Sequence, residues 1–120
     1  MIIHRKEVEQ YDELYSKLVS LKGDIAQLSA KKPNETVNEF KLKIINKVLV
    51  QINDLIDGFK PEDDFVAFDL DVLPTNSDVL MMLNLYLNGM SRFKSVNSVE
   101  NSKMDDWGTK YTSKVWIIED

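Results

Sequence analysis

The sequence contains no cysteine and only one histidine, His4. Without thiols, neither disulfide bonds nor thiol catalysis is possible, and the usual structural zinc sites are excluded. A single histidine without a neighbouring carboxylate pair makes neither a catalytic triad nor a metal site. The lack of cysteine fits a reducing compartment. We therefore expect a cytoplasmic protein that needs no cofactor and holds no metal ion.

Glycine and long uncharged runs are also scarce. The four glycines are scattered along the 120 residues, so no glycine-rich phosphate loop is present. The longest stretch without a charged residue, 79–91, is shorter than the roughly 20 apolar residues that a membrane-spanning helix needs. Charged residues follow Met1-Ile2-Ile3 directly, where a secretory signal would have an apolar region. These features predict a soluble protein that does not bind membranes.

Basic residues are few in the second half of the chain. Residues 1–60 hold ten basic and nine acidic residues, whereas residues 61–120 hold five and eleven. Net acidity argues against direct binding to nucleic acid, whose phosphates attract basic surfaces. It permits binding to a basic partner, although solubility is the simpler interpretation. Six acids form a candidate acidic patch without a base among them: Glu62, Asp63, Asp64, Asp69, Asp71 and Asp78.

Two long helical patterns dominate the first half of the chain. Apolar residues recur with alternating spacings of three and four, at Tyr11, Leu14, Leu18, Leu21, Ile25 and Leu28, and again at Leu42, Ile45, Leu49, Ile52, Ile56 and Phe59. The break at 31–36 includes Pro33. Thr36 and Glu39 have the spacing of a capping box, and Gly58 stands where a helix C-cap is expected. The pattern predicts an antiparallel helical hairpin, about 6–30 and 36–58.

A third helix is predicted at about 76–94. Thr75 and Asp78 resemble another capping box, and a second apolar row on the helix at 36–58 requires something to cover it. One stripe of the third helix is apolar at Val79, Leu83, Tyr86, Met90 and Phe93, and further apolar residues, Met81 and Leu85 among them, extend nearly all round it. Such a helix is central to a core or is covered by a second subunit. Since a chain this small cannot easily cover every side, we expect a homo-oligomer.

The remaining segments are less regular. Residues 65–73 are interpreted either as a short strand or as an irregular segment, and the polar stretch 95–109 as a loop. Residues 110–118 are rich in β-forming types and predict a short C-terminal β element. A single strand needs a partner, either residues 65–70, the terminus at Ile2-Ile3, or another subunit. The predicted fold is thus one mainly α domain covering residues 1–120.

One short motif resembles a catalytic sequence. Residues 68–73 resemble the first motif of haloacid-dehalogenase-type phosphatases, an apolar strand that ends in Asp-x-Asp. Their sequence is Phe68-Asp69-Leu70-Asp71-Val72-Leu73. The resemblance implies that Asp69 is the phosphoryl-accepting nucleophile and Asp71 the general acid. The rest of the chain departs from that family, because two long helices precede the motif and no βαβ alternation follows it. The alternative interpretation is a half-buried segment with its acids facing water.

The leading functional hypothesis is therefore contact rather than catalysis. We expect a small protein-interaction module (an adaptor, an accessory subunit or an immunity-type inhibitor) that is not an enzyme and binds a protein partner. The candidate contact residues are Met81, Met82, Leu85, Tyr86, Trp107 and Trp116. The alternative is an acidic inhibitor or nucleic-acid mimic that binds a basic partner through residues 62–78.

Overall fold

The structure is a computed structural model that describes residues 3–104 and 106–119. Its elements are α1 (Arg5–Lys31), α2 (Glu39–Ile56), a 3₁₀ turn η1 (Asp57–Phe59), α3 (Asn76–Val96), β1 (Ser98–Met104) and β2 (Lys110–Trp116). The predicted mainly helical fold, with a helical hairpin, a third helix and a C-terminal β element, is confirmed.

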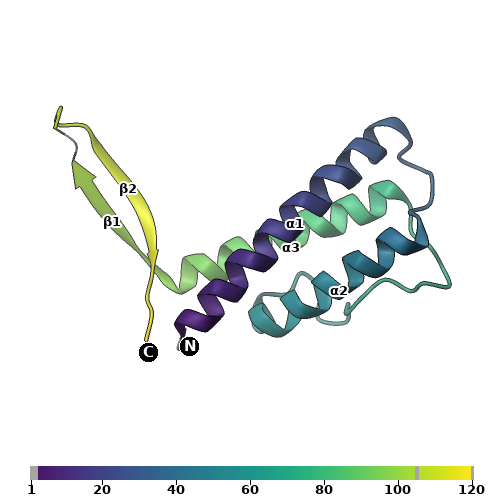
Figure 1. Ribbon diagram of the computed structural model, residues 1–120, viewed down its shortest axis with the longest axis horizontal. Coiled ribbons are helices and arrows are strands. Elements are labelled where there is room, and N and C mark those ends of the chain that lie inside the picture. The colour runs from purple at the N-terminus through teal and green to yellow at the C-terminus, as the bar shows by residue number, and fades with distance from the viewer. Residues whose placement is uncertain (1–2, 105, 120) are drawn as a thin grey trace.

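The three helices form one bundle in which α2 and α3 both run antiparallel to α1 (Figure 1). A β-bridge between Thr36 and Thr75 holds the start of α2 beside the start of α3. The Asn76 side chain donates to the Lys32 carbonyl at 2.8 Å, and its backbone N–H donates to the Glu35 carbonyl at 2.9 Å. The turn that ends α1 is therefore tied to the start of α3. Consistent with this, α1 packs more extensively against α3 than against α2.

The core follows the apolar spacing of the sequence. All five residues of the predicted stripe on α3 are fully buried, as are Leu18 on α1 and Leu42, Leu49 and Ile52 on α2. The second apolar row of α2 is buried at Val37, Val48 and Leu55, whereas Ile44 keeps 42% of its surface exposed. The inference that a third helix covers that wide face of α2 was therefore only partly correct, because a strip beside Ile44 stays open.

Both predicted ends of α2 were wrong. The helix begins at Glu39 with Asn38 as its N-cap, whose side chain accepts from the Lys41 N–H at 3.2 Å, while Thr36 is engaged in the bridge to Thr75. At the other end Asp57, not Gly58, takes the left-handed conformation, with φ of 35°. Aspartate tolerates this region better than most residues. The predicted cap of α3 is correct, since the Thr75 hydroxyl accepts from the Asp78 N–H at 3.2 Å.

The segment between η1 and α3 is irregular rather than a strand, and two asparagines of α2 hold it. Asn46 donates to the Phe68 carbonyl at 2.9 Å and accepts from the Phe68 N–H at 2.8 Å. Two turns further along α2, Asn53 donates to the Val66 carbonyl at 3.0 Å and accepts from the Tyr86 hydroxyl at 2.6 Å. These bonds replace the strand pairing that would otherwise satisfy the backbone of the segment.

The loop predicted at 95–109 is wrong, because β1 occupies most of it and pairs antiparallel with β2, from Ser98 opposite Trp116 to Met104 opposite Lys110. Residues 65–70 are therefore not the partner of β2. Beyond the sheet, Ile3 makes a parallel bridge to Ile118, so the N-terminal alternative is correct for Ile3, while Ile2 lies outside the described residues. The β1 sequence shows no strand signal because alternation of apolar and polar residues arises only where one face is buried.

The hairpin of β1 and β2 projects from one end of the bundle (Figure 1). The molecule measures 53 × 33 × 20 Å, and its radius of gyration is 17.0 Å. A compact chain of this length has a radius of gyration of about 14 Å. The excess reflects an arm that lies outside the helical core.

Candidate protein-contact site

An aromatic cluster fastens the root of the hairpin to the bundle. The Trp116 ring meets the Tyr11 ring edge-on with centroids 4.9 Å apart and lies 6.2 Å from Phe93. The Lys94 ammonium lies 5.6 Å from the centre of the Trp116 ring, within the range of a cation–π contact. Trp116 is half-buried. Of the predicted contact residues, Trp116 is thus chiefly an anchor that joins β2 to α1 and α3.

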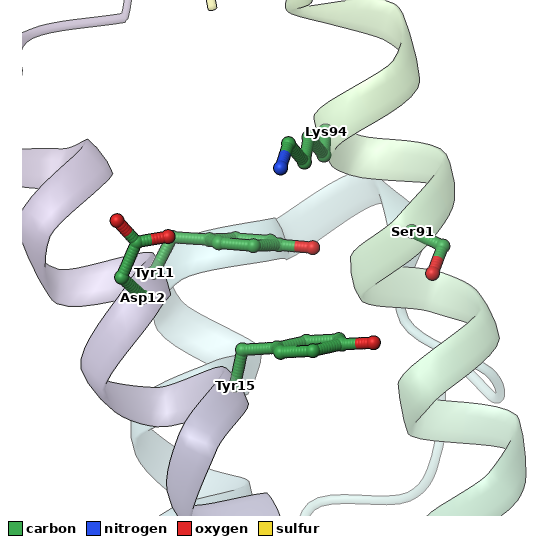
Figure 2. Close-up of a pocket in the computed structure, with 5 residues that line it drawn as sticks. All are labelled: Tyr11, Asp12, Tyr15, Ser91 and Lys94. Carbon is green, nitrogen blue, oxygen red and sulfur yellow. The ribbon is translucent and has the colours of Figure 1, made fainter. Parts of the chain in front are cut away.

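Beside this root, α1 and α3 enclose a depression of about 370 Å³ lined by Tyr11, Asp12, Tyr15, Ser91 and Lys94. Figure 2 shows the two tyrosine rings projecting from α1 toward α3, one above the other, with Lys94 on the far side of the Tyr11 ring. The rings are 5.8 Å apart and nearly parallel, at 10°. The tyrosines lie four residues apart on α1, a spacing that places them on one face of the helix.

The polar groups of the depression differ in how far the protein itself engages them. The Tyr11 hydroxyl is buried and donates to the Met90 carbonyl at 2.9 Å. Burial, with smaller contributions from Tyr15 and Asp12, raises the pKa of Tyr11 well above its usual value. This phenol therefore stays protonated at neutral pH and its proton is already engaged, so it is neither a base nor a nucleophile. The Tyr15 and Ser91 hydroxyls and the Lys94 ammonium add further hydrogen-bonding groups to the lining of the depression.

The hairpin itself presents apolar side chains to solvent. Trp107, in the turn between the strands, is 92% exposed. Val99 and Val115 are register partners, and Ile117 follows two residues after Val115, so all three share one face of the strands. They are exposed by 53%, 44% and 53%. We call these four residues, Trp107, Val99, Val115 and Ile117, the hairpin surface.

The structure separates the other predicted contact residues from the hairpin surface. Met81 and Leu85 are exposed by 59% and 37% and belong to the N-terminal half of α3, the half that lies away from the hairpin (Figure 1). Met82 is half-buried. Tyr86 is fully buried and bonded to Asn53, so it does not belong to any contact surface. The apolar side chains around α3 led to the prediction of a second subunit. Most of them pack against the chain's own core, and of that predicted set Met81 and Leu85 are exposed.

The six acids of the acidic patch are all exposed. None of them forms an ion pair within residues 3–104 and 106–119. Asp69 accepts from the Asp71 N–H at 2.9 Å within a turn, so the two carboxylates do not follow a strand as the phosphatase motif requires. In the described part of the chain the only sheet is the antiparallel pair of β1 and β2, and no three acidic or histidine side chains gather as metal ligands.

Several residues that shape this site escaped sequence reasoning. Tyr15 and Lys94 line the depression, and Asn46 and Asn53 position the acidic segment. The asparagines carried a usable signal, since they lie seven residues apart on one face of α2, each four residues after a buried leucine of the predicted apolar row. Val99 of the hairpin surface carried none, because β1 was not expected, whereas Val115 lies within the β element predicted at 110–118.

Comparison of the sequence with family models and with curated proteins, and of the structure with solved structures, gave no significant match. Among the helices of the described residues, none has the length and apolarity to cross a membrane.

Proposed function

We propose that this chain is a small cytoplasmic protein-binding module that works through the hairpin surface. The observation that carries the proposal is a two-stranded arm, projecting from the bundle, with Trp107 92% exposed at its tip. An isolated two-stranded hairpin is marginally stable in water, and tryptophan is enriched among the residues that dominate binding energy. The described side chains of the hairpin surface, Val99, Trp107, Val115 and Ile117, are all exposed rather than part of the helical core. A binding role accounts for both features.

The anchored root supports the same proposal. Trp116 is held against Tyr11 and Phe93, and the Ile117 N–H donates to the Asn97 carbonyl at 2.8 Å. An arm that is fixed at its base loses less conformational freedom on binding than a free loop would. An adaptor, an accessory subunit or an immunity-type inhibitor would each use such an arm. Self-association through Met81 and Leu85 remains a prediction beside it.

Trp107→Ala is expected to weaken binding of the physiological partner by about thirtyfold or more, since truncation of a tryptophan that dominates a contact typically costs about 2 kcal/mol or more. The stability of the chain should hardly change, because the side chain is 92% exposed. The measurement is quantitative affinity capture from the source cells with the wild-type and variant proteins as baits, followed by titration of the captured protein.

Phe40→Ala is the matched control. Phe40 is also an exposed aromatic residue, at 72%, but it lies on α2 away from the hairpin. The Phe40→Ala variant should capture the partner as well as the wild type does. Equal loss from both variants, or capture that survives Trp107→Ala, would rule out the hairpin surface as the principal contact.

The acidic patch supports a second candidate function, binding of a basic partner by an inhibitor or nucleic-acid mimic. Its carboxylates are exposed and form no ion pair with the described residues, and Asn46 and Asn53 hold in place the segment that carries most of them. Binding through exposed charges should weaken steeply as the salt concentration rises, because the Debye length falls from about 10 Å at 0.1 M to about 3 Å at 1 M. Capture repeated at both salt concentrations, with an Asp63→Asn/Asp64→Asn variant beside the wild type, tests this. A partner retained at high salt and by the variant would exclude this candidate.

A further inference from the structure

The outer edges of the hairpin carry unpaired backbone groups. In an antiparallel pair, successive residues of a strand point their N–H and C=O groups alternately toward the partner strand and away from it. The Ile117 N–H donates inward to the Asn97 carbonyl, and Val99 pairs with Val115 in the same register. The backbone N–H and C=O groups of odd-numbered residues in both strands therefore point toward the partner strand. Those of even-numbered residues point away from it. Along β2 the outward-facing backbone belongs to residues 110, 112, 114 and 116.

Among residues 3–104 and 106–119, the hairpin is a two-stranded sheet, and the one further pairing beside it is the bridge of Ile3 to Ile118, beyond the end of β2 (Figure 1). An uncovered edge is a template for a further strand, and proteins recognise extended segments in this way. A third strand would also supply what the two-stranded arm lacks, since three strands are needed for independent stability. The open edge and the marginal stability of the arm thus point to the same kind of occupant.

Charge distinguishes the two edges and selects the occupant. The sequence of β2, KYTSKVW, contains two lysines and no acid, whereas that of β1, SVENSKM, contains one of each sign. The sequence of β2 is thus basic in a chain of net charge −5. Pairing of β2 with β2 of a second copy about Thr112 would place Lys110 opposite Lys114 twice, and like charges directly opposite each other are destabilising. An acidic strand would instead meet complementary charge.

We propose that the outer edge of β2 binds an extended acidic segment of a partner protein as a third strand. This inference rests on the proposed function, since it names the way in which the arm makes contact and the chemistry of its partner. It adds a backbone component, directed by residues 110, 112, 114 and 116, to the apolar contact of the hairpin surface.

The probe is a short synthetic peptide of alternating valine and glutamate, compared with the same peptide carrying lysine in place of glutamate. Amide hydrogen exchange and chemical shifts of the full chain are followed by NMR during titration. The glutamate peptide should protect the amides of residues 110, 112, 114 and 116 from exchange. The inward-facing amides are already hydrogen-bonded and should gain less protection from exchange. The lysine peptide should bind about tenfold more weakly or not at all, because its charge repels that of β2.

Thr112→Pro is the decisive variant. Proline at this position removes one outward-facing N–H and leaves the inward ladder intact, as proline does on natural edge strands. It should weaken binding of the glutamate peptide by about tenfold, whereas Thr112→Val should retain it. Shifts of the Val99 and Val115 amides in the free variant confirm that the arm is still formed. If those shifts are lost, a glutamate peptide N-methylated on its strand-facing amides gives the same test on the wild-type chain.

Three outcomes would overturn the inference. They are a titration without protection of the four outward-facing amides, equal binding of the lysine peptide, and concentration-dependent protection of those amides in the free chain, which would show that β2 pairs with itself. Shifts at Trp107, Val99 and Val115 without protection of the outward-facing amides would show contact through the side chains alone. In that case strand addition would fail while the proposed function stood. Failure of the proposed function would appear separately, as capture that does not depend on Trp107.

Discussion

Asn53→Ala is expected to lower the free energy of unfolding by about 2–4 kcal/mol, because it leaves the buried Tyr86 hydroxyl without a partner and also removes a part-buried hydrogen bond to the Val66 carbonyl. The Tyr86 hydroxyl, which donates to Asn53 at 2.6 Å, belongs to a fully buried residue. The Val66 carbonyl, which accepts from Asn53 at 3.0 Å, would lose its donor. Chemical denaturation of the wild type and the variant measures the loss. Against a typical total of about 5–15 kcal/mol, the change is large.

A double-mutant cycle separates this network from simple packing. Tyr86→Phe alone should cost about 1–2 kcal/mol, and the double variant Asn53→Ala/Tyr86→Phe should cost less than the sum of the two, since no hydroxyl is then stranded. Asn84→Ala, at an exposed position of α3, is the control and should change stability by less than about 0.5 kcal/mol. Strict additivity of the two single changes would show that Asn53 and Tyr86 do not act as a pair.

Gly89→Ala is expected to destabilise the chain by about 1–3 kcal/mol, although alanine is the better helix former by about 1 kcal/mol. A Cβ at this position would lie 2.5 Å from the Phe59 carbonyl oxygen and 3.4 Å from the Cδ1 atom of Ile56. The clash is with backbone, so α3 and η1 must move apart. Denaturant titration and the amide shifts of η1 report the effect.

Gly23→Ala gives the opposite expectation on another helix. No atom lies within 4 Å of the Cβ that alanine would add there, so only the helix propensity changes. The free energy of unfolding should rise by up to about 1 kcal/mol. The opposite signs make the pair diagnostic. If both variants gained stability equally, the close approach of η1 to α3 would be incorrect.

The helical part of the fold could be predicted because its signal is local. The stripe from Val79 to Phe93 follows the period of a helix with one buried face, and all five of its residues are buried in the structure. The first helix was predicted within one residue at each end, and the start of the third correctly. Tyr86 was nevertheless placed on the contact surface as well as in the stripe, because periodicity does not show which apolar residues of a crowded helix face solvent.

The parts of the candidate site that could not be predicted depend on contacts between distant residues. Asn53 is 13 residues from Val66 and 33 from Tyr86. The pairing of β1 with β2 could not be predicted, because the β-forming residues at 110–118 do not identify a partner and the sequence of β1 was interpreted as a loop. The two ends of α2 were misplaced for a related reason. Several nearby residues could have capped it, and the bridge between Thr36 and Thr75 decided among them.

By itself the sequence determined that this protein is a helical bundle without thiol chemistry and with an acidic second half. Hydrophobic spacing, charge and composition act locally along a chain, and they suffice for those conclusions. Only the tertiary structure decided that Trp116 anchors an arm, that Trp107 stands at its tip, and that Tyr86 is buried. The physical reason is that exposure and edge pairing depend on which surfaces the folded chain covers, and that is set by packing between segments far apart in sequence.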